Sequence, residues 1–223
     1  MKTVSLILMF FTLTTTAQDW ANLGKYQKEN AAVQLYGNQE GRVVFMGNSI
    51  TEGWSTTLPE FFKGKPFINR GISGQTTPQM LLRFRQDVID LKPEVVHILA
   101  GTNDIAENTG PISLEQIRDN VLSMVQLAKA NGIKPIVCSV LPAYDYPWRP
   151  NKNPNIKIPK LNAMLAEMAA ENRVMYLDYF SEMADNRNGL PQKYTTDEVH
   201  LTKAGYEVLE RVFQKAINQL LGR

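Results

Sequence analysis

The sequence predicts a three-layer α/β/α domain with about five parallel β-strands at its centre. Short apolar runs without polar interruptions alternate along the chain with longer stretches of helical periodicity. Strands that are buried on both faces have this continuous apolar character, and parallel strands require helical crossovers between them. Such crossovers are almost always right-handed, which leaves few topologies for the sheet.

The spacing of apolar residues locates each expected element. An amphipathic helix is expected over 19–33, packed outside the core. Ser113 and Gln116 have the spacing of a capping box, and Asn131 followed by Gly132 is a common helix end. Strands are expected at 42–46, 66–69, 94–100, 133–140 and 174–178, and further helices at about 78–90, 113–131, 158–172 and 202–221.

The composition is typical of an ordinary globular protein. The chain has 223 residues, of which 43% are hydrophobic and 21% charged, and this length can bury a sizeable core without disulfides. Its one cysteine, Cys138, lies in an apolar run and is interpreted as a buried small hydrophobe rather than a reactive thiol. A net charge of +2 without a Lys/Arg stripe predicts no nucleic-acid partner.

The first eighteen residues are interpreted as a secretory signal peptide. Lys2 precedes a short apolar run over 4–13, which small residues follow through Ala17. The run is short for a membrane span, and no cysteine follows it that could carry a lipid, so no permanent membrane anchor is expected. We expect cleavage after Ala17 or Gln18 and export of one domain, 19–223, to the periplasm or the exterior. A buried N-terminal strand is the alternative.

Short segments far apart in the chain carry the residue types that acyl transfer from oxygen requires. Ser49 directly follows an apolar run and is a candidate nucleophile, for which His200 could be the base. Asp197, three residues before that histidine, could fix its tautomer. The neutral side-chain amide of Asn103 is suited to stabilise an oxyanion, and the backbone N–H of Gly74 could be a second donor.

The predicted topology brings these segments to one edge of the sheet. Ser49, Gly74 and Asn103 follow the first, second and third strands, and the segment that leads to His200 follows the fifth. Parallel strands end on the same edge, where ligands bind in doubly wound folds. The alternatives are structural: Ser49 as a helix N-cap, Asn103 as a loop cap, Gly74 as a turn glycine, and Asp197 with His200 as a capping loop.

The two remaining features are an isolated histidine and a long loop. His97 lies in the middle of an apolar strand and is assigned to the core, and two histidines so placed predict no zinc site. The irregular stretch over 141–154 follows the fourth strand, hence lies on the predicted catalytic edge, and long loops are often functional. Trp148 and Arg149 in this loop, together with Trp54 after the nucleophile, are candidate substrate-binding residues; the alternative is structural packing.

Ser49, Gly74, Asn103 and His200 occur in the order and local contexts of the SGNH hydrolases, also called GDSL-type lipases and esterases. From about residue 40 to the C-terminus the chain resembles this family. The resemblance implies a flavodoxin-like strand order, 2-1-3-4-5, and a triad of Ser49, His200 and Asp197. It also implies an oxyanion hole formed by the N–H groups of Ser49 and Gly74 with the Asn103 amide, and a reaction without cofactor or metal.

One position departs from the family pattern, since Asn48 stands where the family's Gly-Asp-Ser block has aspartate. The resemblance implies a serine esterase. The predicted export and the aromatic loop favour short acyl groups, O-acetyl groups above all, on small-molecule or oligosaccharide esters as its substrates. A lysophospholipase or acyl-thioesterase of the same family is the alternative. From other classes, a non-catalytic carbohydrate-binding module and an O-acetyltransferase that uses the same serine remain open.

Overall fold

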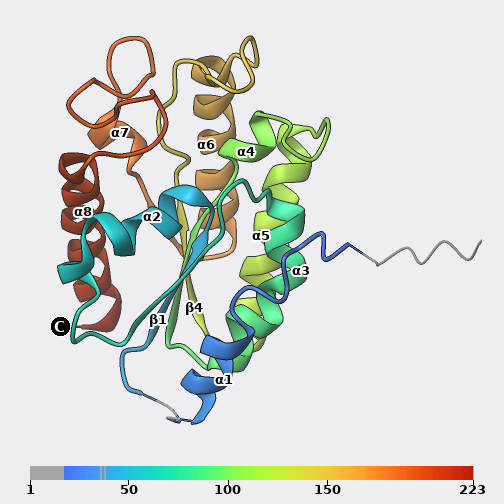
Figure 1. Ribbon diagram of the computed structural model, residues 1–223, viewed down its shortest axis with the longest axis vertical. Coiled ribbons are helices and arrows are strands. Elements are labelled where there is room, and N and C mark those ends of the chain that lie inside the picture. The colour runs from blue at the N-terminus through green and yellow to red at the C-terminus, as the bar shows by residue number, and fades with distance from the viewer. Residues whose placement is uncertain (1–17, 36, 38, 223) are drawn as a thin grey trace, which may run out of the picture.

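A single five-stranded parallel sheet forms the centre of the protein (Figure 1). The computed structural model describes residues 18–35, 37 and 39–222, so the predicted signal peptide lies outside the described residues apart from its last position. The strand order is β2-β1-β3-β4-β5, which confirms the predicted order 2-1-3-4-5. The strands are β1 Val43–Gly47, β2 Phe67–Gly71, β3 Val95–Leu99, β4 Lys134–Cys138 and β5 Met175–Leu177.

Helices cover both faces of the sheet, as the three-layer prediction requires (Figure 1). Alternate residues of β1 point to opposite layers: Val44 and Met46 pack with α3, α5 and α6, whereas Val43 and Phe45 pack with α2 and α8. The helices are α1 Gln27–Leu35, α2 Ser49–Thr57, α3 Thr77–Asp87, α4 Thr102–Ile105, α5 Leu114–Ala130, α6 Pro154–Glu171, α7 Phe180–Met183 and α8 Lys203–Leu221.

The register of the sheet aligns the carboxyl ends of β1, β2 and β3. Gly47 at the end of β1 pairs with Gly71 at the end of β2 and with Leu99 at the end of β3. The loops that follow these three strands therefore begin side by side at the same edge of the sheet.

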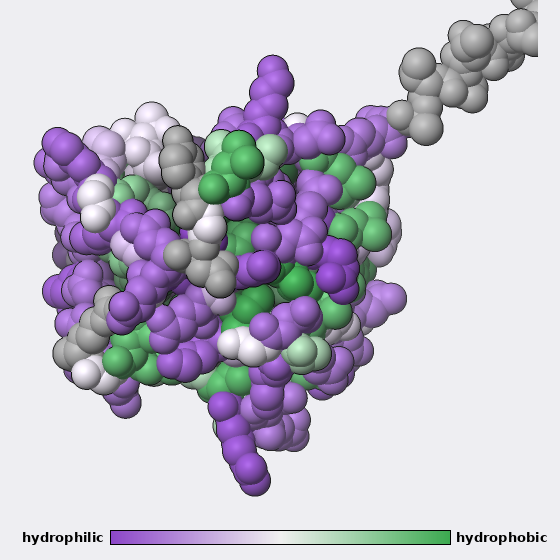
Figure 2. All heavy atoms as spheres, turned by 90° about the horizontal axis from the view of Figure 1, so that it is seen from below, coloured by the Kyte–Doolittle hydropathy of each residue, from purple (hydrophilic) through white to green (hydrophobic). Residues whose placement is uncertain are grey.

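Figure 2 shows the molecule from the opposite edge, where the strands begin. Polar side chains surround scattered apolar ones on this face.

Several helical boundaries differ from the expected ones. The helix expected over 19–33 begins at Gln27, and turns precede it. Helix α2 was not predicted, because Thr, Ser and Gly have low helix propensity; the fully buried Trp54 anchors it to the core instead. Helix α6 begins at Pro154, a residue that fits the first helical turn. The capping box of Ser113 and Gln116 at the start of α5 is confirmed.

Candidate active site

The strand-to-helix turn between β1 and α2 places Ser49 at the first position of α2. A Cβ on Gly47 would lie 2.0 Å from Thr51 Oγ1 and 2.9 Å from the Leu99 carbonyl oxygen, so this close turn requires glycine. Asn48 is the buried N-cap, and its Oδ1 accepts a hydrogen bond from the Ile50 N–H at 3.0 Å. Asparagine therefore supplies the acceptor that the cap needs without the charge of an aspartate.

Ser49, His200 and Asp197 form one hydrogen-bonded chain. The distance from Ser49 Oγ to His200 Nε2 is 3.0 Å, and that from His200 Nδ1 to Asp197 Oδ2 is 2.6 Å. The side chains of His200 and Asp197 are 46% and 40% exposed, so solvent and ligands can reach the imidazole. This geometry allows the imidazole to take a proton from the hydroxyl while the carboxylate holds the other ring nitrogen.

A tight loop before α8 orients the Asp197 carboxylate. Its Oδ1 accepts the N–H groups of Val199 at 3.0 Å and His200 at 2.7 Å, and Glu198 between them has a left-handed φ of 68°. Partial burial alone would raise the pKa of Asp197, but the hydrogen bonds from the side chain and backbone of His200 outweigh it, and the net shift is downward. The Thr195 hydroxyl donates to the His200 carbonyl at 2.8 Å, and this bond links the two ends of the loop.

The loop after β2 presents Gly74 toward open space. Gly74 has a φ of +77°, and no atom lies within 4 Å of where a Cβ would be. The Glu52 carboxylate accepts the Ser73 N–H at 2.7 Å, and Asn108 Nδ2 donates to the Gly74 carbonyl at 3.2 Å. Helix α2 and the segment after α4 therefore both hold this loop.

Asn103 lies in the short helix α4 and is almost fully buried. Its Nδ2 donates to the Gln75 carbonyl at 3.0 Å, so the side-chain amide is tied to the residue that follows Gly74. Its neighbour Asp104 accepts the Thr77 N–H at 2.9 Å and the Thr77 hydroxyl at 2.6 Å. Burial raises the pKa of Asp104 to about 6, and these bonds make it a structural acceptor at the start of α3.

Trp148 lies beside His200. Its ring centroid is 6.3 Å from that of His200, the residue is 40% exposed, and its Nε1 donates to Asn108 Oδ1 at 3.0 Å. Since Asn108 also holds the Gly74 carbonyl, it links the aromatic loop to the predicted oxyanion donors. Sequence reasoning missed Asn108, because nothing in its local context distinguishes it from any loop asparagine. Arg149 is exposed on the same loop.

The expectation that Trp54 binds substrate is wrong. Trp54 is fully buried, stacks on Phe61 with ring centroids 4.7 Å apart, and meets the edge of Phe45 at 5.5 Å. In an α-helix, five residues turn the side chain by about 140°, so Trp54 faces the sheet while Ser49 faces the site. Proximity in sequence to Ser49 does not place Trp54 at the candidate site, because α2 directs the two side chains to different faces.

The described residues offer neither a cluster of metal ligands nor a membrane-spanning helix. Across 18–35, 37 and 39–222, no three His, Cys, Asp or Glu side chains gather in an arrangement that could hold a metal ion. None of the helices within those ranges has both the length and the apolar character to cross a membrane.

Known structures share this fold and much of this sequence. A crystal structure from Bacteroides fragilis is 49% identical to the chain, covers 92% of it and 99% of its own length, and superimposes with a TM-score of 0.88. A GDSL-like lipase from Bacteroides thetaiotaomicron is 47% identical with a TM-score of 0.85, and the alignment covers 90% of this chain and 98% of that one.

Curated relatives are more distant. The esterase TesA of Pseudomonas aeruginosa is 27% identical, and the alignment covers 75% of this chain and 80% of TesA. An acetylxylan esterase of Geobacillus stearothermophilus is 24% identical, and the alignment covers 67% of this chain and 71% of that esterase. The uncharacterised lipoprotein YqeF of Bacillus subtilis is 35% identical over 46% of this chain, and the alignment spans about half of its length, 51%.

A family model assigns this chain to a protein family. The model of the GDSL-like lipase/acylhydrolase family matches residues 45–208, a range that contains every residue of the candidate site. This range begins within β1 and ends within α8, so it contains the end of β1 and the whole of the other four strands. The chain therefore belongs to the GDSL-like lipase/acylhydrolase family and is an ester-cleaving hydrolase.

Proposed function

We propose that the protein is a serine esterase that removes short acyl groups, acetyl above all, from the hydroxyls of carbohydrates. The observation that carries this proposal is the 3.0 Å contact between Ser49 Oγ and His200 Nε2, backed by the 2.6 Å contact between His200 Nδ1 and Asp197. A serine hydroxyl becomes nucleophilic when a positioned base takes its proton. An ionised Asp197 stabilises the imidazolium that results.

The first half-reaction forms an acyl-enzyme. Ser49 Oγ attacks the ester carbonyl while its proton moves to His200 Nε2, and the carbonyl oxygen becomes an oxyanion. Three donors are suited to hold it: the Ser49 N–H, which lies among the unpaired N–H groups at a helix start, the Gly74 N–H, and the Asn103 amide. An amide nitrogen has two hydrogens, so one remains for the oxyanion beside the bond to Gln75.

Collapse of this tetrahedral intermediate completes the first half-reaction: the ester bond breaks, the imidazolium gives its proton to the departing alcohol, and the acyl group stays on Ser49 Oγ. The second half-reaction regenerates the serine. Water attacks the acyl-enzyme as His200 takes a proton from it, and the second tetrahedral intermediate collapses to release the acid as His200 returns the proton to Ser49 Oγ. No cofactor or metal takes part in these steps.

Two features favour a carbohydrate ester as substrate. Trp148 offers a half-exposed aromatic surface 6.3 Å from the His200 ring, and flat aromatic faces suit sugar rings. The acetylxylan esterase relative acts, by its name, on such esters. Arg149 on the same loop is the second proposed contact to the substrate.

A substrate panel tests the proposal. We expect hydrolysis of p-nitrophenyl acetate and butyrate, a steep loss with longer acyl chains, and release of acetate from acetylated xylo-oligosaccharides. Preference for palmitoyl-CoA or lysophosphatidylcholine would instead assign a thioesterase or lysophospholipase. Transfer of acetyl to an added oligosaccharide acceptor would assign a transferase, and sugar binding without turnover would assign a binding module.

Export is part of the proposal. The features of residues 1–18 support it, and the Bacillus subtilis relative carries the name of a lipoprotein. Mature protein recovered from the periplasm or the medium should begin at Gln18 or Asp19 in N-terminal sequencing. An intact Met1 in the cytosolic fraction alone would contradict export.

A further inference from the structure

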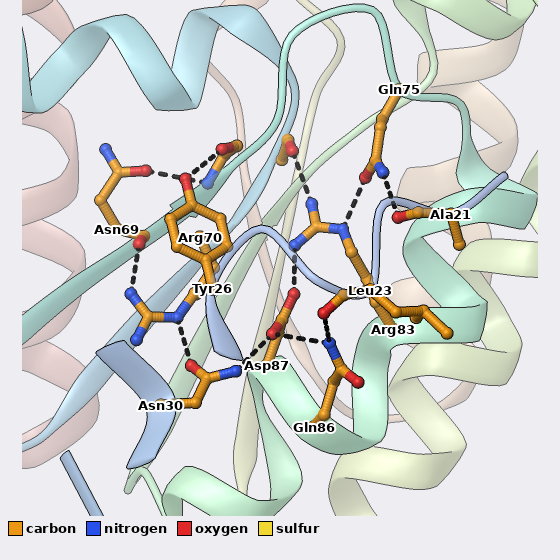
Figure 3. A network of polar contacts seen from close by, with 12 residues as sticks. Ala21, Leu23, Tyr26, Asn30, Asn69, Arg70, Gln75, Arg83, Gln86 and Asp87 are labelled. Carbon is orange, nitrogen blue, oxygen red and sulfur yellow. Dashed lines mark hydrogen bonds and ion pairs between the residues drawn. The ribbon is translucent and has the colours of Figure 1, made fainter. Parts of the chain in front are cut away.

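A buried arginine, Arg83, lies within a network of polar contacts (Figure 3). Arg83 on α3 is 0% exposed. Its Nη2 donates to the Gly47 carbonyl at 3.0 Å, its Nε to Gln75 Oε1 at 2.5 Å, and its Nη1 to Asp87 Oδ2 at 3.0 Å. One guanidinium thus joins the turn that leads into Ser49 to the loop that follows β2.

The residues that Arg83 holds are neighbours of the proposed catalytic groups. Gly47 lies two residues before Ser49, and Gln75 directly follows Gly74. The backbone carbonyl of Gln75 accepts the Asn103 amide at 3.0 Å. The guanidinium therefore contacts the backbone of Gly47, which precedes the proposed nucleophile, and the side chain of Gln75, which follows the proposed donor Gly74.

Stability alone gives a weak reason for this arrangement. Burial lowers the pKa of Arg83, which reflects the cost of taking its charge out of water, and Asp87 partly offsets it. Apolar side chains of similar volume often replace buried ion pairs without loss of stability. The fork of five guanidinium donors, however, can hold three acceptors in fixed directions, which a lysine cannot do.

The network continues into the segment before α1. Gln75 Nε2 donates to the Ala21 carbonyl at 2.7 Å, and Gln86 Nε2 donates to the Leu23 carbonyl at 2.6 Å (Figure 3). Gln75 is therefore fixed at both ends of its side-chain amide, by Arg83 on one side and by backbone on the other. Its own backbone has little freedom to move away from Asn103.

We propose that Arg83 is a positioning residue for the esterase reaction. It fixes the backbone of Gly47 and Gln75, so that Ser49 and the donors of Gly74 and Asn103 hold the geometry of the tetrahedral intermediate. This inference rests on the proposed function. Misplacing a reacting group by about 1 Å costs on the order of 100-fold in rate, so loss of Arg83 should lower kcat while the ground-state ester still binds.

The chain offers a matched control in a second buried arginine. Arg42 is 4% exposed and donates to the carbonyls of Leu91 and Gly37, but it precedes β1 at the opposite edge of the sheet. Replacement of Arg42 by methionine removes a buried guanidinium with its hydrogen bonds, far from the site. The pair Arg83→Met and Arg42→Met therefore separates positioning from general destabilisation.

The experiment measures kcat and KM for p-nitrophenyl acetate, and the Ki of a boronic acid that forms a tetrahedral adduct with serine, well below each variant's Tm. For Arg83→Met we expect kcat to fall by about 10- to 100-fold, KM to change less than about threefold, and Ki to rise with the loss in kcat/KM. Arg83→Lys should not restore kcat, and Arg42→Met should keep kcat within about twofold.

A second variant tests the same inference if Arg83→Met does not fold. Gln75→Leu removes the link between Arg83 and the oxyanion loop but keeps the guanidinium paired with Asp87, and it should show the same split between kcat and KM. Wild-type kcat in soluble, folded Arg83→Met or Gln75→Leu overturns the positioning role, as does an equal loss in Arg42→Met. Equal turnover by wild type and Ser49→Ala instead overturns the proposed function, and the positioning role with it.

Discussion

The two histidines of this chain occupy opposite environments. His97 lies in the middle of β3 and is 0% exposed, and its Nε2 is 2.9 Å from the Tyr179 hydroxyl oxygen. His200 lies in a loop beyond the sheet, with a carboxylate on one ring nitrogen and a serine hydroxyl on the other. The same side chain is therefore a packing element in one place and a candidate base in the other.

Solvation and partners make the difference. Burial lowers the pKa of His97 to about 3, so its imidazole is neutral near pH 7. The side chain of His200 is 46% exposed, and its two ring nitrogens contact the Asp197 carboxylate and the Ser49 hydroxyl. The position beyond the carboxyl edge of the sheet therefore leaves this ring open to solvent, whereas the interior of the same sheet encloses His97.

The largest expected effect on activity comes from removing the Ser49 hydroxyl, the contact that His200 has and His97 lacks. Ser49→Ala should lower kcat by about 10⁶-fold, the scale observed for a triad serine, with an unchanged Tm. Ser55→Ala on the same helix is the control and should keep full activity. Comparable turnover by purified Ser49→Ala would remove Ser49 as the nucleophile.

Replacing the carboxylate that faces His200 tests the role of its partner. Asp197→Asn keeps the shape but favours the wrong tautomer of His200, and kcat should fall by about 10⁴-fold. Steady-state kinetics at pH 7 measure this loss. A variant within tenfold of wild type would show that the imidazole is oriented without this carboxylate.

Asn103 separates catalysis from stability. Asn103→Ala should lower kcat by about 10²- to 10³-fold with little change in KM, the usual cost of losing one oxyanion donor. Its bond to the Gln75 carbonyl also contributes about 1 kcal/mol to stability. Urea unfolding and kinetics on one preparation measure both quantities, and a destabilised but fully active variant would assign Asn103 to loop structure alone.

Trp148 tests whether substrate lies beside His200. Trp148→Ala should raise KM for acetylated xylo-oligosaccharides by about tenfold, in line with the value of one aromatic stacking contact. Trp148→Phe should restore most of the affinity, and p-nitrophenyl acetate should be affected less. Equal effects on both substrates would indicate a general change in the loop rather than a lost sugar contact.

His97 provides the smallest effect on activity and a distinct effect on stability. His97→Gln should keep kcat within about twofold. Because the folded pKa of about 3 lies below the usual value of 6.5, the unfolded chain binds more protons between these values, and wild-type stability falls as pH falls through this window, by at most about 1.4 kcal/mol per pH unit.

The glutamine variant should lack this contribution, so its loss of stability between pH 6.5 and 3 should be shallower. Asp104, whose pKa is raised to about 6, acts in the opposite direction between 3.8 and 6, since there the folded state binds the extra proton. It is present in both proteins and cancels in the comparison. Parallel pH profiles of unfolding for wild type and His97→Gln would contradict the assignment.

Sequence reasoning predicted the parts of the molecule that depend on local pattern. The five strands and their parallel arrangement followed from apolar runs, and the family resemblance supplied the strand order that the structure confirms. The same reasoning placed Ser49, Gly74 and Asn103 at one edge, because each directly follows a strand, and the structure brings them there. Their catalytic roles stay predictions.

The parts that escaped prediction depend on tertiary contacts. The burial of Trp54 follows only once α2 is known to be a helix, and packing rather than helix propensity stabilises that helix. Arg83 and Asp87, four residues apart on α3, have the spacing of an exposed ion pair, yet both are buried. Asn108 bridges two loops whose conformations no local pattern specifies.

The wide separation of Ser49 and His200 along the chain has a consequence for synthesis. The serine precedes the histidine by 151 residues, and at about 5–20 residues per second a ribosome needs roughly 8 to 30 s to cover that distance. During this interval the emerging polypeptide contains the proposed nucleophile without its proposed base. A product interrupted anywhere in that span cannot complete the hydrogen-bonded chain from serine to aspartate, so the proposed acyl transfer awaits synthesis of His200.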